Sequence, residues 1–156
     1  MNELTSVDYA NLLRDLAYTR KNINLNKTQV NKLLFMCYGF YIASSGNKLF
    51  SNEPPRAWPY GPVFPIVYKT YNNYSIPISI GNKDKEIEKC NPIAHRLCLD
   101  IVDACSDISA YDLSMWSHKV GSPWHKTVYG DKKVTDDEVV WNKEISDELI
   151  KSYFKK

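Results

Sequence analysis

The sequence predicts a mainly α fold: a compact single-domain helical bundle of about six short helices with at most a small β element. A chain of 156 residues fits one domain, and neither an internal repeat nor a linker divides it. Hydrophobic residues make up 44% and charged residues 24%, a balance that allows a core without a metal or disulfides. Apolar residues recur at helical spacing between capping residues, Gly and Pro. We therefore treat residues 1–156 as one domain.

The strongest helix is predicted to begin after Asn26 and to form the centre of the bundle. Asn26 and Gln29 have the spacing of a capping box, in which each side chain accepts a hydrogen bond from the other residue's backbone amide. Apolar side chains then occupy nearly every face over residues 30–42, which is typical of a helix buried on several sides. Gly46 suits the left-handed conformation that ends many helices.

Capping residues predict the other helices in the same way. A capping box of Thr5 and Asp8 indicates a first helix that reaches about Tyr18. Further helices are predicted to follow the capping residues Asn91, Ser109, Ser122 and Ser146. The first of these four helices, which begins at Pro92, has an apolar face that includes Ile93 and Cys98.

The middle of the chain is rich in proline and is predicted to contain less helix. A long connection is expected over residues 47–61. A helix is then predicted to begin with Pro62, because the amide hydrogen that proline lacks is not needed at the first helical position. Residues 76–80 alternate and predict a short edge strand, and residues 81–89 predict a charged loop.

The nearly balanced charge argues against nucleic acid as a partner. The chain has 20 basic and 18 acidic residues, and the basic ones are scattered, whereas a nucleic-acid binder usually has a basic excess or a dense basic face. A helix-turn-helix over residues 5–41 remains an alternative. Its recognition helix would have to present polar and basic side chains to DNA, and the second helix offers only Asn31 and Lys32 before it becomes apolar.

The chain is expected to be cytoplasmic and to have no membrane partner. It begins without a basic segment followed by an apolar run, and its most apolar stretch, residues 33–43, is too short to span a bilayer. The four cysteines form no CxxC pair, which suits reduced thiols better than a disulfide framework.

No metal site and no cofactor are predicted. His118 and His125 are seven residues apart, as are Cys98 and Cys105, and neither pair has the short spacing of a zinc site. Cysteines on an apolar stripe usually behave as small hydrophobic residues. His95, beside a basic residue on a helix flank, is expected to be solvated.

No catalytic residue is predicted either. Several serines lie near His118, with Asp112 close in sequence, but a triad is defined by geometry, and Ser109 and Ser122 already serve as helix caps. An enzyme is therefore the third interpretation, after a protein-binding module and a DNA-binding regulator.

Aromatic residues are abundant, at 13% of the chain. Trp58, Tyr60 and Trp124 lie in turns or at helix starts, where a ring either fills a gap in the core or anchors a partner. The core is the commoner place for such rings.

Three stretches, in order along the chain, resemble the Panacea domain, also called the SocA-like antitoxin domain. The first comprises Lys32–Phe35, Gly39–Tyr41 and Gly46–Phe50. The second comprises Ala57–Val63, Pro65 and Val67–Tyr68. The third comprises Leu113–Ser114, Ser117–His118 and Gly121–Trp124, with Ser117 where the family often has Thr. Ile150 and Tyr153–Phe154 fit the terminal helix, so the resemblance covers about residues 28–154.

The resemblance implies an antitoxin of a toxin–antitoxin pair, encoded beside its toxin in a bacterium or in a phage or prophage. It implies neutralisation by direct binding of a protein toxin, with delivery of the toxin to a cellular protease as an alternative. Together with the aromatic residues, it places the predicted partner-binding surface at Trp58, Tyr60, His118 and Trp124.

Overall fold

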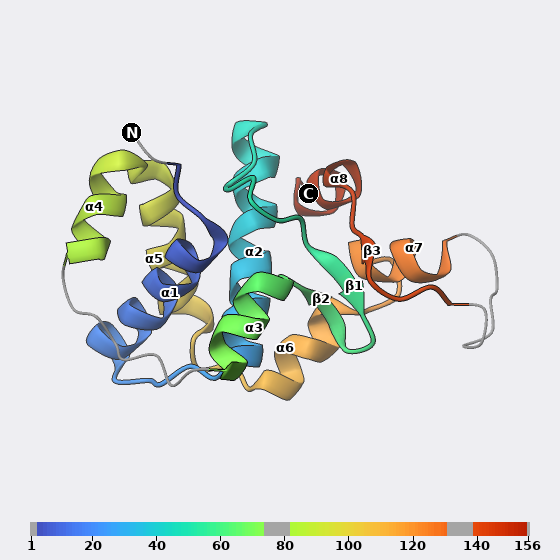
Figure 1. Cartoon of the computed structure of the whole chain (residues 1–156), viewed down its shortest axis with the longest axis horizontal. Helices are drawn as coiled ribbons and strands as arrows, with labels where there is room; N and C mark the ends of the chain where they lie inside the picture. The colour runs from blue at the N-terminus through green and yellow to red at the C-terminus, as the bar shows by residue number, and fades with distance from the viewer. Residues whose placement is uncertain (1–2, 74–81, 131–138, 156) are drawn as a thin grey trace.

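The computed structural model describes residues 3–73, 82–130 and 139–155 (Figure 1). Within these ranges it contains eight helices and one small sheet, which confirms the mainly α fold. The helices are α1 (Ser6–Lys21), α2 (Lys27–Ser45), α3 (Pro65–Asn73), α4 (Asn82–Cys90), α5 (Pro92–Cys105), α6 (Ala110–Ser117), α7 (Pro123–Tyr129) and α8 (Asp147–Phe154). The strands are β1 (Arg56–Trp58), β2 (Gly61–Val63) and β3 (Lys143–Glu144). A bilayer-crossing segment is not found among the described helices, since none combines sufficient length with sufficient apolarity.

Helix α2 is the centre of the fold. It packs against α1, α3, α5, α6 and α8, and Figure 1 places it between α1, α4 and α5 on one side and the sheet, α7 and α8 on the other. Every residue from Val30 to Gly39 is buried. This confirms the central helix that the apolar residues predicted. It also excludes α2 as the recognition helix of a helix-turn-helix, because a buried face cannot enter a DNA groove.

The predicted helix caps are confirmed. The amide of Asp8 donates to Thr5 Oγ1 at 3.3 Å, and the amide of Thr5 donates to Asp8 Oδ2 at 2.9 Å. The reciprocal pair of Asn26 and Gln29 has distances of 2.8 and 3.0 Å. Gly46 follows α2 with a φ of +77°. The side chains of four further caps accept a backbone hydrogen bond at the starts of α5, α6, α7 and α8: Asn91, Ser109, Ser122 and Ser146.

The sheet is antiparallel, with the strand order β2–β1–β3. Strands β1 and β2 form a tight hairpin in which Trp58 lies opposite Gly61. The prediction of a helix beginning with Pro62 is therefore wrong. Pro62 lies in β2 opposite Ala57, at an edge of the sheet, where proline is tolerated because an edge strand has a side without ladder bonds.

Two buried side chains fix where α3 begins. The amide of Phe64 donates to Asn31 Oδ1 at 2.9 Å, and the amide of Ile66 donates to Glu53 Oε1 at 2.8 Å. Glu53 is 6% exposed, and its other carboxylate oxygen accepts a hydrogen bond from Ser6 Oγ at 2.5 Å. The proline-rich connection is thus joined to α1 and α3 by one buried carboxylate.

The prediction of a charged loop over residues 81–89 is wrong, since α4 covers almost all of it. Ile87 is fully buried, and α4 packs against α5 and α1. A single apolar residue among charged neighbours gives little helical periodicity, which is why the pattern indicated a loop. The strand predicted over residues 76–80 lies outside the described residues.

Helix α4 also corrects two expectations for α5. His95 was expected to be solvated, but it is 6% exposed because α4 covers it. Its Nε2 contacts Asp84 Oδ1, and its Nδ1 lies 3.9 Å from Glu88 Oε2. Ile93, expected on the apolar face, is 70% exposed.

Helix α8 closes the fold over α2. The ring of Phe154 lies in edge-to-face contact with Phe35, Phe40 and Trp116, with centroids 5.8, 4.9 and 6.1 Å apart. The ring occupies the space beside Gly39, where a Cβ atom would lie 2.2 Å from it. The missing side chain of Gly39 therefore allows α8 to pack closely.

Candidate partner-binding site

The β1–β2 hairpin presents one ring to solvent. Because Trp58 pairs with Gly61, the turn between the strands consists of Pro59 and Tyr60. The Tyr60 side chain is 81% exposed. The turn therefore presents to solvent a large ring with an apolar body and a polar tip, a side chain that suits contact with another protein.

Because Gly61 has no side chain, this turn can pack closely against α6 and α2. Its φ is +118°, a conformation that other residues rarely adopt. A Cβ atom at this position would lie 2.6 Å from Ser117 Oγ and 3.2 Å from Lys32 Nζ. The backbone of the hairpin therefore lies closer to α6 and α2 than a residue with a side chain would allow.

Replacing Gly61 with Ala is expected to destabilise the domain by about 2 kcal/mol, since the new methyl group adds a clash to an unfavourable φ. Gly121→Ala is the matched control: Gly121 has a φ of +89°, and a Cβ there meets nothing within 4 Å. The control should lose only about 1 kcal/mol. Urea unfolding of both variants measures the difference, and equal losses would show that the hairpin does not depend on this close approach.

One of the four predicted contact residues, Trp124, lies beneath this surface, and His118 is half-buried beside it. Trp124 is 4% exposed and donates a hydrogen bond from Nε1 to the carbonyl oxygen of Trp58 at 2.7 Å. The ring of His118 packs edge-to-face on Trp124 at 5.4 Å. Among the described residues, His118 Nδ1 is buried without a hydrogen-bond partner. Trp124 supports the hairpin from below, and its burial prevents it from being an exposed anchor.

Trp58 is half-buried and is held from two sides. Its Nε1 donates to Asn142 Oδ1 at 2.9 Å, and its ring packs edge-to-face on Tyr68 with centroids 5.2 Å apart. Asn142 comes from the segment before β3 and has a φ of +72°. The structure thus brings all four predicted residues around one hairpin: Tyr60 is exposed, Trp58 and His118 are half-buried, and Trp124 is buried.

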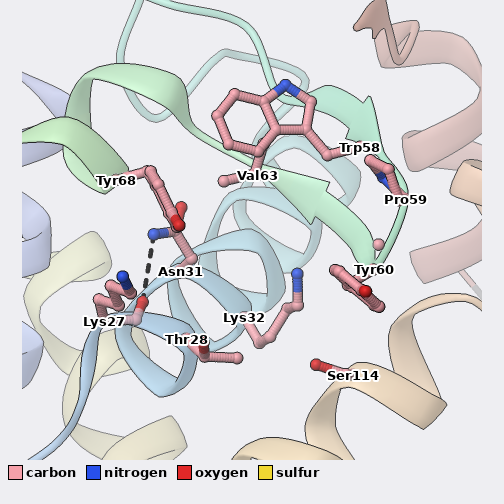
Figure 2. Close-up of a pocket in the computed structure, with 11 residues that line it drawn as sticks. Lys27, Thr28, Asn31, Lys32, Trp58, Pro59, Tyr60, Val63, Tyr68 and Ser114 are labelled. Carbon is pink, nitrogen blue, oxygen red and sulfur yellow. Dashed lines mark hydrogen bonds between the residues drawn. The ribbon is translucent and has the colours of Figure 1, made fainter. Parts of the chain in front are cut away.

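A pocket of about 300 Å³ lies between the hairpin and the first turns of α2 (Figure 2). We call it the Lys32 pocket. It is lined by Lys27, Thr28, Asn31, Lys32, Trp58, Pro59, Tyr60, Gly61, Val63, Tyr68 and Ser114. In Figure 2 the Lys32 side chain rises from α2 toward the hairpin, with Tyr60 on one side of the pocket and Tyr68 on the other.

Lys32 carries an unusual buried charge. The residue is 5% exposed, and its Nζ donates to the carbonyl oxygen of Pro62 at 2.7 Å. Burial lowers the pKa of Lys32 to about 8, because removal from water disfavours the ammonium form. Lys32 still carries its proton at neutral pH.

A second hollow, of about 540 Å³, lies on the β3 side of Trp58. It is lined by Arg56, Trp58, Pro59, Pro65, Lys69, Trp141 and Asn142. Both hollows therefore combine aromatic rings with basic side chains, and none of the residues that line either one is Asp or Glu.

The part of the chain that the structure describes holds no group of three or more His, Cys, Asp or Glu that could bind a metal ion. All four cysteines are free thiols. Burial raises the pKa of the Cys37 thiol well above its usual value, so this buried thiol is not a nucleophile at neutral pH.

The sequence matches the model of a known protein family over a range that includes this surface. The model of the antitoxin SocA-like, Panacea domain matches residues 30–125, which is more than half of the chain. The chain belongs to this family. No curated protein and no solved structure matches it.

The family match covers α2 from Val30 onward, the hairpin and α6 of this Panacea domain, and all four predicted contact residues lie within it. Lys32 was not among the site residues predicted from the sequence. A signal existed, since Lys32 stands in a helix that is otherwise apolar on nearly every face. Trp141 lies outside the match, so its place beside Trp58 follows only from the folded structure.

Proposed function

We propose that this Panacea domain is an antitoxin that neutralises a co-encoded protein toxin by binding it directly. Its membership of the SocA-like family supports an antitoxin role. The observation that carries the mode of action is Tyr60, a ring 81% exposed at a hairpin tip and beside a pocket. Tyrosine and tryptophan are the residues that most often supply binding energy at protein interfaces.

The rigidity of the hairpin supports this role. Gly61 packs closely against α6, and the carbonyl oxygen of Trp58 accepts the hydrogen bond from Trp124. An anchor that is already fixed loses little conformational entropy on binding. We infer that Tyr60 and Trp58 contact the toxin, whereas Trp124 and His118 hold the hairpin in position.

The outer face of α6 extends the proposed surface. Tyr111 is 72% exposed and Met115 is 46% exposed. They are four residues apart, on the helical face that also carries Ser114, a residue lining the Lys32 pocket. We infer that the toxin contacts them together with the hairpin, because a standard protein interface buries about 800 Å² per partner and one exposed ring covers only part of that area.

We further propose that this neutralisation involves no catalysis and takes place in the cytoplasm of a bacterium or of a phage-infected cell. The four free thiols are compatible with a reducing compartment. Occupation of the toxin's surface is sufficient for inhibition, so no reacting group is required at the hairpin.

Co-expression with the adjacent gene tests this function. The adjacent gene alone should arrest growth, and this chain should restore it and co-purify with the gene product. Tyr60→Ala should weaken the complex by about 30-fold or more, because an interface anchor is lost while the fold is retained.

Tyr18→Ala is the matched control, since Tyr18 is 40% exposed on α1, in a different part of the fold. It should restore growth as the unchanged chain does. A harmless neighbouring gene, or an unchanged chain that neither restores growth nor binds the product, would contradict the proposal.

A further inference from the structure

The Lys32 pocket has positive charge at its floor and no carboxylate among its lining residues. Lys32 is 5% exposed, so its ammonium group has lost most of its hydration. A buried charge of this kind is usually paired with an opposite charge. Here the hydrogen-bond acceptor is a neutral carbonyl oxygen, that of Pro62, at 2.7 Å.

The ammonium group of Lys32 has more N–H donors than the described residues offer acceptors. A lysine has three N–H donors, and within the described residues the geometry provides an acceptor for one of them. Gly61 also lies close to this ammonium group, since a Cβ atom at this position would come within 3.2 Å of Nζ. Lys32 thus lines the pocket although the residue is 5% exposed, and Gly61 contributes no side chain beside its ammonium group.

The walls of the pocket suit a chain that bears an anion. Lys27 Nζ lies 4.8 Å from the centroid of the Tyr68 ring, which positions a second cation at the wall. Trp58 packs edge-to-face on Tyr68, and the exposed Tyr60 stands at the rim (Figure 2). Rings of this kind pack against the apolar part of a side chain or a peptide backbone.

We propose that the Lys32 pocket receives a carboxylate of the toxin, from an Asp or Glu side chain or from its carboxyl terminus. Lys32 pairs with the carboxylate. Trp58 and Tyr60 hold the segment that carries it. This inference rests on the proposed function, because the carboxylate belongs to the protein that the antitoxin binds.

A carboxylate fits better than a nucleic-acid phosphate. The net charge of the chain is only +2, which provides little long-range attraction for a polyanion. The second hollow beside Trp58 also contains two basic residues, Arg56 and Lys69, and no acidic one. An acidic segment of a protein can follow both hollows around the hairpin, and the family is one of antitoxins.

Titration calorimetry with the purified product of the adjacent gene tests the pairing. Lys32→Met keeps the length and apolar stem of the side chain but removes its charge, and it should weaken binding by about 30-fold or more. Lys85→Met is the control for net charge, because Lys85 is exposed on α4, away from the pocket. It should bind as the unchanged chain does.

Variants of the toxin identify the other half of the pair and do not depend on the folding of Lys32→Met. Each Asp and Glu is changed to its amide, and the carboxyl terminus is amidated. One of these changes should weaken binding by about 30-fold or more, and should add little further loss to that of Lys32→Met. If an Asp or Glu substitution weakens binding, the carboxylate belongs to a side chain. If amidation of the terminus weakens binding, it is the terminal carboxylate.

The outcomes separate the two proposals. A toxin that does not bind the unchanged chain refutes the proposed function and this inference with it. Binding that is equally tight with Lys32→Met, or that withstands every toxin variant, refutes the carboxylate pairing alone. Loss of binding to single-stranded RNA in Lys32→Met, with unchanged affinity for the toxin, would also overturn it.

Discussion

Replacing Gly39 with Ala is expected to destabilise the domain by about 2 kcal/mol, although alanine is the better helix former. The new Cβ atom would lie 2.2, 2.3 and 2.7 Å from three atoms of the Phe154 ring. That ring cannot move aside easily, because it packs against Phe35, Phe40 and Trp116. Urea unfolding followed by circular dichroism measures the loss.

A double-mutant cycle makes this prediction specific to the Gly39–Phe154 contact. Phe154→Ala alone should cost about 3–5 kcal/mol, the usual cost of emptying a core position that held an aromatic ring. In that background Gly39→Ala should be neutral or slightly stabilising, because the clash is gone and helix propensity improves. An equal loss in both backgrounds would contradict the close packing of α8 on α2.

The second large effect is a pH-dependent difference between Lys32→Met and the unchanged chain. Folding lowers the pKa of Lys32 from 10.5 to about 8, so the folded state binds fewer protons than the unfolded state between these values. The unchanged chain should therefore gain stability relative to the variant as pH rises through this window. The expected gain is about 3 kcal/mol by pH 10.5.

Below pH 8 the difference should be small and constant, because the relief of a buried charge offsets the lost hydrogen bond to Pro62. Burial raises the pKa of Tyr71 to about 12, and such tyrosines destabilise both proteins alike above pH 10. Their contribution cancels when the two unfolding free energies are subtracted. A difference that does not change with pH would show that Lys32 is not buried as a cation.

These predictions connect stability to function at Lys32. Residues that cost folding free energy are common at functional sites, where activity and stability trade off. If the carboxylate pairing is correct, Lys32→Met should be a well-folded protein with a weakened complex. Measuring stability and affinity on the same variant distinguishes this outcome from simple unfolding.

The sequence predicted those parts of the fold that depend on local signals. The capping pair of Asn26 and Gln29 marked the start of α2, and apolar residues on nearly every face indicated its central position. Helix α4 was missed because Ile87 is its one fully buried apolar residue among the described positions, and the burial of His95 was missed with it. Burial imposed by a neighbouring helix is not visible in the periodicity of a segment.

The hairpin was missed for a related reason. The pairing of Trp58 with Gly61 creates a ladder from proline-rich sequence that shows no alternation of apolar and polar residues. The same pairing decides which predicted site residues are exposed. Tyr60 reaches solvent because it lies in the turn, whereas Trp124 is buried because it supports the strand beneath. The sequence therefore indicated residues that the fold brings together, but not which of them the fold exposes.

The most direct test of the account uses only two purified proteins, this chain and the product of the adjacent gene. Titration calorimetry in the absence of any protease should show a saturable complex, weakened by about 30-fold or more in Tyr60→Ala and unchanged in Tyr18→Ala. No binding until a protease is added, or equal binding by both variants, would contradict neutralisation by a surface centred on the hairpin.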